Sequence, residues 1–221
     1  MYHDRTEAGE TLARALQACE MRRPVVFALP RGGLPVAVPV ARALGAPLDL
    51  LLVRKIGLPG QPEVAAGAIV DGPPELVFYN ERILRAFGLG HDDLAGTIET
   101  KRAELAERRQ SYLAGRAPVD VTGRTAVVVD DGIATGATMQ AALMGLRERG
   151  PADVILAVPV AARDALDALR ALVDHVVCPQ VPSHFRAVGL HYDRFEQVPD
   201  AEVTRIMQEA MTDPDDTDRQ E

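Results

Sequence analysis

Between residues 126 and 177 the chain alternates apolar runs with amphipathic runs. The pattern predicts strands at 126–130, 153–158 and 173–177, separated by helices at 137–149 and 163–171. Strands that alternate with helices of this length form right-handed β-α-β units, and such units require a parallel sheet. We therefore expect an α/β fold, an open parallel sheet flanked by helices.

The N-terminal half predicts further elements of the same kind. Apolar spacing indicates a helix at 7–20 and strands at 25–29 and 48–53, joined by a helix with Pro35 in its first turn. Residues 54–63 are rich in glycine and proline, which favours a mobile loop. The following segments predict, in order, a β excursion, a long charged helix and a last short helix: 64–79, 92–113 and 201–211.

Length and composition limit the classes of protein that fit. The 221 residues are consistent with one domain at 1–211, a small C-terminal hood region at about 179–200, and a disordered acidic tail at 212–221. A net charge of -8 argues against a nucleic-acid partner. The most apolar stretch, 34–53, holds two charged residues and three prolines, so we expect no membrane span. Two cysteines without a framework, and a polar N-terminus, predict a cytoplasmic protein.

The strongest candidate site follows the strand at 126–130. Asp130 and Asp131 end this strand, so they should lie at the carboxyl edge of the sheet, where open α/β sheets bind ligands. There the two carboxylates can accept hydrogen bonds from neighbouring sugar hydroxyls. The next residues are small or hydroxylated and open a helix, so their amides can wrap a phosphate: Gly132, Ile133, Ala134, Thr135, Gly136, Ala137 and Thr138.

An ordinary strand that ends in a turn is the alternative interpretation of this stretch. The unbroken order of strand, paired acids, small-residue loop and helix favours a sugar-phosphate site instead. The chain contains no G-x-x-x-x-G-K-[ST] motif for a nucleoside triphosphate and no G-x-G-x-x-G motif for a dinucleotide.

Two further segments carry positive charge at the ends of predicted strands. Gly32 and Gly33 would allow the backbone to approach an anion closely, and Arg31 would add charge, although a plain strand-to-helix turn would look the same. Arg54 and Lys55 follow the next strand, where a solvated basic pair is the alternative.

Together these segments resemble the type I phosphoribosyltransferase family. The resemblance rests on Val-Asp-Asp-Gly-Ile-Ala-Thr-Gly at 129–136, Pro-Arg-Gly-Gly at 30–33 and Val-Arg-Lys-Ile-Gly-Leu-Pro at 53–59. The pattern is especially similar to a small bacterial group whose acceptor is unassigned. It implies an Mg2+-dependent pentosyltransferase that transfers the phosphoribosyl group of 5-phosphoribosyl 1-diphosphate to a nitrogenous acceptor, with a purine as one candidate, and releases diphosphate.

The resemblance also implies roles for individual residues. Arg31, Arg54 and Lys55 would be catalytic through the diphosphate. Asp130 and Asp131 would hold the ribose and reach Mg2+ indirectly, through the ribose hydroxyls or water. The small-residue loop at 132–138 would hold the 5'-phosphate.

Other implied features concern the diphosphate turn and the acceptor. Gly32 and Gly33 would line the diphosphate, the Pro30–Arg31 peptide bond would be cis, and 56–63 would form a lid. Phe185 would stack on the base. The resemblance further suggests a homodimer with a role in nucleotide metabolism such as purine salvage.

Position 134 restricts the choice of acceptor. Ala134 stands where hypoxanthine-guanine enzymes carry an acid that is the proposed general base, whereas adenine and xanthine enzymes have alanine there. The residue that would act as general base therefore stays unassigned. A regulatory protein that binds phosphoribosyl diphosphate or a nucleotide without turning it over, and a hydrolase or phosphorylase-like enzyme, are the alternatives.

Overall fold

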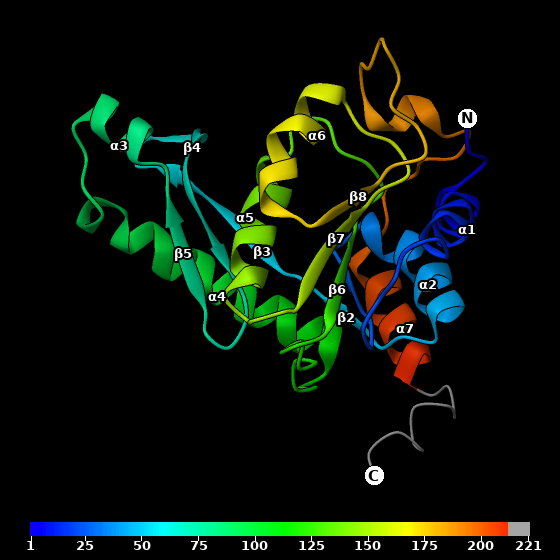
Figure 1. The fold of residues 1–221 in the computed structure, drawn as a ribbon. Helices are drawn as coiled ribbons and strands as arrows, with labels where there is room; N and C mark the ends of the chain where they lie inside the picture. The colour runs from blue at the N-terminus through cyan, green and yellow to red at the C-terminus, as the bar shows by residue number, and fades with distance from the viewer. Residues whose placement is uncertain (212–221) are drawn as a thin grey trace.

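The computed structural model describes residues 1–211, and the acidic tail predicted at 212–221 lies outside them. Its centre is a five-stranded parallel sheet in the order β2-β1-β6-β7-β8 (Figure 1). The strands are β1 (Val25–Ala28), β2 (Leu48–Leu50), β6 (Thr125–Val129), β7 (Asp153–Ala157) and β8 (His175–Val177). The expected open parallel sheet is therefore confirmed.

Helices cover both faces of this sheet. One face packs against α1 (Arg5–Leu16), α2 (Gly33–Leu44) and α7 (Asp200–Met211). The other face packs against α5 (Ala137–Arg147), α6 (Arg163–Leu169) and the 3-10 turn η2 (Arg170–Leu172). Successive side chains of β6 alternate between the two cores: Val127 and Val129 enter the first, Ala126 and Val128 the second. Burial on both faces explains why residues 126–129 of this strand are all apolar.

The order of the strands creates a switch point between β1 and β6. From β1 the chain crosses through α2 to β2 on one side, and from β6 it crosses through α5 to β7 on the other. The carboxyl ends of β1 and β6 lie side by side, with Ala28 opposite Val129. Crevices at such switch points are where open α/β sheets bind ligands. The turn after β1 and the paired acids after β6 both open into this crevice.

A smaller lobe projects from the main sheet, at the left in Figure 1. It contains the antiparallel sheet β3 (Val53–Leu58), β4 (Gln61–Val70) and β5 (Leu76–Tyr79). Helices α3 (Glu81–Phe87) and α4 (Ala95–Leu113) follow, joined through the 3-10 turn η1 (Asp92–Leu94). The β excursion predicted at 64–79 and the long helix at 92–113 are confirmed, the latter beginning as the 3-10 turn.

The prediction of a mobile loop at 54–63 is wrong, because these residues form the β3–β4 hairpin. Leu58 pairs with Gln61 across a turn at Pro59 and Gly60, and Gly60 has the positive φ of 75° that such a turn needs. The segment proposed as a lid is thus paired backbone in this structure, and the sheet of the small lobe was not predicted as a separate unit.

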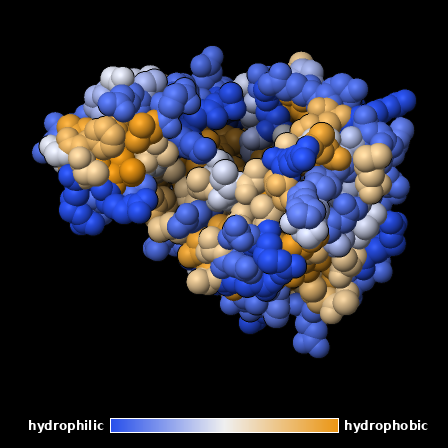
Figure 2. Space-filling model, turned by 90° about the horizontal axis from the view of Figure 1, so that it is seen from above, coloured by the Kyte–Doolittle hydropathy of each residue, from blue (hydrophilic) through white to orange (hydrophobic). Residues whose placement is uncertain are grey.

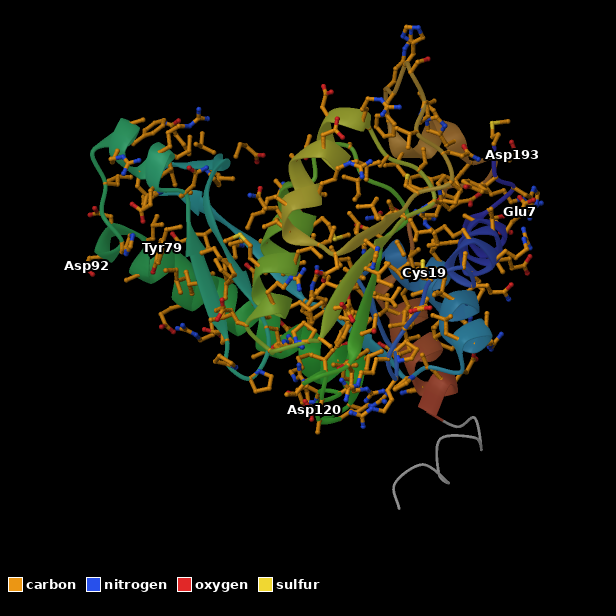
Figure 3. The ribbon with its side chains drawn as sticks, in the orientation of Figure 1. Glu7, Cys19, Tyr79, Asp92, Asp120 and Asp193 are labelled. Atoms are coloured by element: carbon orange, nitrogen blue, oxygen red, sulfur yellow. The ribbon has the colours of Figure 1, made fainter. Side chains whose placement is uncertain are left out.

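The expected hood segment, 179–200, crosses the top of the main sheet with little regular structure. It contains the 3-10 turn η3 (Val188–His191) and is tied down by bridges from Tyr192 to Tyr2 and from Gln180 to Val160. Asp193 and Glu7 consequently lie at the same end of the molecule (Figure 3). No helix among the described residues is long and apolar enough to cross a membrane.

Candidate functional site

Asp130 and Asp131 lie directly beyond β6, at the switch point. The Oδ1 atom of Asp130 accepts a hydrogen bond from the Asp131 amide at 2.8 Å. Burial, followed by the neighbouring Asp131 charge, raises the pKa of Asp130 well above its ordinary value. Burial also raises the pKa of Asp131, against the lowering effect of Arg5. Two acids in a desolvated crevice are costly unless a ligand supplies donors or positive charge, so the pair is suited to binding rather than to stability.

The loop after the acids forms an open cradle of amides. Helix α5 starts after Gly136, which has a φ of 76°. Among the described residues, the amides of 134–138 donate no hydrogen bond, whereas Ile133 donates to Val160 O at 3.0 Å and holds the loop to the sheet. Ala134, Thr135 and Ala137 are exposed. Unpaired amides at a helix N-terminus favour an anion such as a phosphate group.

The turn after β1 lies against the acids. The Pro30–Arg31 peptide bond is cis, as the resemblance implied. A Cβ atom at Gly32 would lie 2.0 Å from Asp131 Oδ2, and one at Gly33 would lie 2.8 Å from Val129 O. A side chain at either position would therefore displace the neighbouring acid or its backbone. In the described part of the chain the Arg31 and Gly32 amides make no hydrogen bond, so both can donate to a ligand.

Arg5 contacts the site although it belongs to none of the motifs predicted from the sequence. Its Nε donates to Asp131 Oδ2 at 2.9 Å, and Nη2 lies 2.9 Å from the same oxygen. Helix α1 can bring Arg5 here because Gly9 lets it lie directly on α2, where a Cβ would be 2.4 Å from Val36 O. Tyr192 supports the same acid by donating its hydroxyl to Asp131 O at 2.5 Å.

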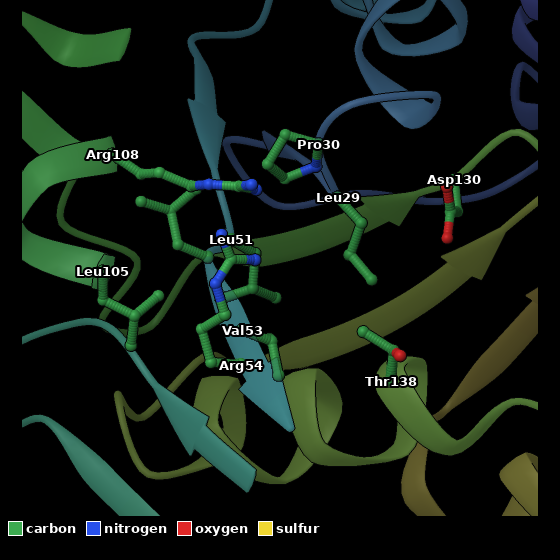
Figure 4. A pocket seen from close by; sticks show the side chains of 10 residues that line it. Leu29, Pro30, Leu51, Val53, Arg54, Leu105, Arg108, Asp130 and Thr138 are labelled. Atoms are coloured by element: carbon green, nitrogen blue, oxygen red, sulfur yellow. The ribbon is translucent and has the colours of Figure 1, made fainter. Parts of the chain in front are cut away.

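Basic residues from the small lobe line a second part of the crevice. A cavity of about 140 Å³ is bounded by Asp130, Thr138, Arg54 and Arg108, together with apolar side chains of the main sheet and α4 (Figure 4). Burial first, and then the nearby Arg108, lower the pKa of Arg54. Arg54 Nε lies 3.3 Å from Glu104 Oε2, but the alignment makes no hydrogen bond. These two guanidiniums therefore favour an anion between the lobes.

Lys55 and Arg31, two of the predicted site residues, are not among the residues that line this cavity. Lys55 is exposed on β3, next to Arg54 in the chain but pairing with Ala68 on β4. Arg31 Nη1 lies 3.7 Å from Asp200 Oδ2 at the start of α7. The Tyr112 hydroxyl hydrogen-bonds to Asp200, and this contact is the main cause of the lowered pKa of that acid. The surface is hollowed between the small lobe and the larger body (Figure 2).

Phe185 occupies a different place from the crevice residues. Its ring stacks on His191 with centroids 5.5 Å apart and packs against the cluster of Tyr2 and Tyr192. Phe195, which lies ten residues further along, lines a cavity of about 350 Å³ beside Asp131. The predicted stacking role of Phe185 stays a prediction.

The donors present fit an Mg2+ ion only when a substrate supplies most of its ligands. No group of three or more His, Cys, Asp or Glu side chains among residues 1–211 is arranged to hold a metal. Asp130 and Asp131 provide two carboxylates next to a cradle for phosphates, and Mg2+ is commonly bound by one or two carboxylates plus substrate phosphates. Asp130 and Asp131 would therefore hold the ion through the ribose hydroxyls or water.

Comparisons with known proteins agree with this geometry. The family model described as a phosphoribosyl transferase domain matches residues 2–194. A Mycobacterium tuberculosis (strain ATCC 25618 / H37Rv) protein, provisionally named a phosphoribosyl transferase, is 41% identical over 213 residues, 96% of this chain and 48% of that protein. The chain thus spans about half the length of the curated relatives it matches.

Two solved structures show the same fold. The protein TT1426 from Thermus thermophilus superposes with a TM-score of 0.83 at 42% identity, covering 94% of this chain and 98% of that chain. The protein AQ2163 from Aquifex aeolicus has a TM-score of 0.50 at 13% identity, covering 84% of this chain and 78% of that one, and shares the fold alone.

Proposed function

Because the chain belongs to the phosphoribosyl transferase domain family, we propose that it transfers the phosphoribosyl group of 5-phosphoribosyl 1-diphosphate to a nitrogenous acceptor and releases diphosphate. One observation carries this proposal. At the switch point of the sheet lie a pair of acids, a cradle of amides and a glycine turn, and the amides of 134–138, Arg31 and Gly32 donate no hydrogen bond within residues 1–211. This combination matches the sugar, the 5'-phosphate and the diphosphate of one molecule.

Each group of the substrate has a partner in this arrangement. Asp130 and Asp131 accept hydrogen bonds from the two ribose hydroxyls, and the amides of 134–138 hold the 5'-phosphate. Negative charge grows on the diphosphate as its bond to the sugar breaks, and Arg31, Arg54 and Lys55 stabilise that charge. Bound Mg2+ would supply further positive charge at the diphosphate oxygens. The protein contributes position and electrostatics and needs no covalent intermediate.

The acceptor and the assembly are further proposals. We propose a ring nitrogen or amine as the attacking atom, with a purine stacked on Phe185 as the first candidate to test. Ala134 provides no acid to act as general base, so an acceptor whose nitrogen is nucleophilic without deprotonation would suit the site. We also propose that the protein works as a homodimer in the cytoplasm, in nucleotide metabolism.

A release assay tests the proposed reaction directly. The full chain is incubated with 5-phosphoribosyl 1-diphosphate, Mg2+ and a panel of purines, pyrimidines and amines, and both free diphosphate and the mass of the nucleotide product are measured. The Asp130→Asn/Asp131→Asn variant serves as the inactive control. We expect release that depends on one class of acceptor. Binding without release across the panel would favour the regulatory alternative.

A further inference from the structure

The side chain of Arg5 is fixed on three sides. Nε donates to Asp131 Oδ2 at 2.9 Å, and Nη1 donates to Glu196 O at 2.9 Å. The Arg5 guanidinium also stacks over the Phe195 ring, with Cζ 4.0 Å from the centroid. The Arg5 side chain is only 12% exposed. A buried guanidinium held in one orientation is pre-organised to recognise a planar or tetrahedral anion.

The same guanidinium borders the larger cavity of the site. This cavity, of about 350 Å³, is lined by Arg5, Arg31, Gly32, Asp131 and three residues of the C-terminal segment. Two positive charges and one negative charge face it. The Arg31 and Gly32 amides, which make no hydrogen bond within residues 1–211, belong to the same wall. The lining therefore carries a net charge of +1 and offers several hydrogen-bond donors.

Arg5 retains donors for a ligand. An arginine has five N–H groups; in Arg5, Nε and Nη2 each contact Asp131 Oδ2 and Nη1 donates to Glu196 O, which leaves one N–H group on each terminal nitrogen. Because Arg5 and Arg31 both line the cavity, these two remaining donors are available to an anion bound there. Charge-assisted bonds from guanidinium to phosphate are about twice as strong as neutral ones.

We infer that Arg5 is a binding residue for the diphosphate group of the substrate, forming with Arg31 and the Gly32 amide a clamp on the side of the crevice opposite Arg54 and Arg108. This inference rests on the proposed function. In this clamp, helix α1 contributes a positive charge to one end of the diphosphate. Helix α1 lies outside the three motifs at 30–33, 53–59 and 129–136. Arg5 also orients Asp131, so its two effects need separate measurement.

Titration calorimetry with two part-substrates separates these effects. Inorganic diphosphate with Mg2+ reports on the clamp and does not need Asp131 for a ribose, whereas ribose 5-phosphate reports on Asp131 and the amide cradle. We expect Arg5→Ala to weaken diphosphate binding about 10- to 100-fold, more than it weakens ribose 5-phosphate binding. Arg5→Lys should lose part of this affinity, because lysine keeps the charge without the fork.

A control variant and the unfolding temperature keep the result interpretable. Arg14 lies on the same helix and is exposed, and within residues 1–211 its side chain donates only to Thr11 Oγ1 at 2.9 Å, so Arg14→Ala should bind both compounds like the wild type. If Arg5→Ala and Arg5→Lys bind diphosphate as tightly as the wild type, the inference is overturned and Arg5 only positions Asp131. If the wild type itself binds neither compound, the proposed function fails, and the inference fails with it.

Discussion

Replacing Gly32 by alanine tests the contact between the turn after β1 and the acids after β6. The added Cβ would lie 2.0 Å from Asp131 Oδ2 and 2.7 Å from Asp131 Cγ. Carbon and oxygen atoms that are not bonded do not approach so closely, so the carboxylate must retreat by about 1 Å or more. The Arg5–Asp131 contact, now 2.9 Å, would then exceed hydrogen-bonding distance.

The size of the effect follows from that lost contact. A hydrogen bond between charged groups is worth about 1.5–3 kcal/mol. Asp131 and Arg5 are 15% and 12% exposed, so solvent screens the pair little. For a chain of this size 1 kcal/mol shifts the unfolding temperature by roughly 2–4 °C, and we expect Gly32→Ala to lower it by about 3–12 °C. Because the displaced carboxylate no longer faces the ribose, affinity for ribose 5-phosphate should fall about 10- to 100-fold.

Thermal unfolding followed by calorimetric titration measures both quantities. Gly96→Ala is the matched control, since a Cβ there meets no atom within 4 Å and alanine favours the helix in which Gly96 lies. Gly96→Ala should unfold at the same or a higher temperature and bind normally. An unchanged unfolding temperature together with normal ribose 5-phosphate affinity in Gly32→Ala would refute the close approach on which this reasoning depends.

Three further predictions concern the acids, the exposed lysine and a half-buried thiol. 5-Phosphoribosyl 1-diphosphate with Mg2+ should raise the unfolding temperature of the wild type but not of Asp130→Asn/Asp131→Asn, and equal shifts in a thermal assay would remove the acids from the site. Lys55→Ala should lower turnover about 30- to 1000-fold, with a smaller effect on ribose 5-phosphate affinity, and normal turnover would exclude the lysine. Burial raises the pKa of Cys178 to about 11, so little reactive thiolate is present at pH 8. Alkylation of Cys178, followed by mass spectrometry, should therefore be slow at pH 8 and should accelerate about tenfold per pH unit until that pKa is reached. Rapid labelling at pH 8 would contradict this prediction.

The main sheet could be predicted because its signal is local. β6 is buried on both faces, so four consecutive apolar residues precede the acids, and helices of regular length follow. The small lobe could not be predicted in this way, because glycine and proline content was interpreted as mobility. Gly57 and Gly67 instead permit close strand pairing: a Cβ would lie 2.3 Å from Pro62 O at the first and from Phe78 O at the second.

The candidate site likewise has one part with a local sequence signal and one part that forms only when distant segments pack together. Its sugar and phosphate half lies in one continuous segment, 130–138, and could be predicted from residue order alone. Its charged half is assembled from α1, the turn after β1, β3 and α4; the sequence indicated Arg31 and Arg54 but neither Arg5 nor Arg108. Arg5 and Asp131 are 126 positions apart, and their contact depends on how α1 packs on α2. Arg108 lies on a charged helix, where a solvated arginine would give the same sequence pattern.

One signal in the sequence did point toward Arg5. Gly9 lies inside α1, where glycine costs about 0.5–1 kcal/mol relative to alanine, so its presence there indicates close packing. That packing, with Gly9 against Val36 O, sets the start of α1 beside the carboxyl edge of the sheet. Gly9 therefore helps to fix the position of Arg5 next to Asp131. The chemistry of this site depends on that packing as much as on the motif that contains the acids.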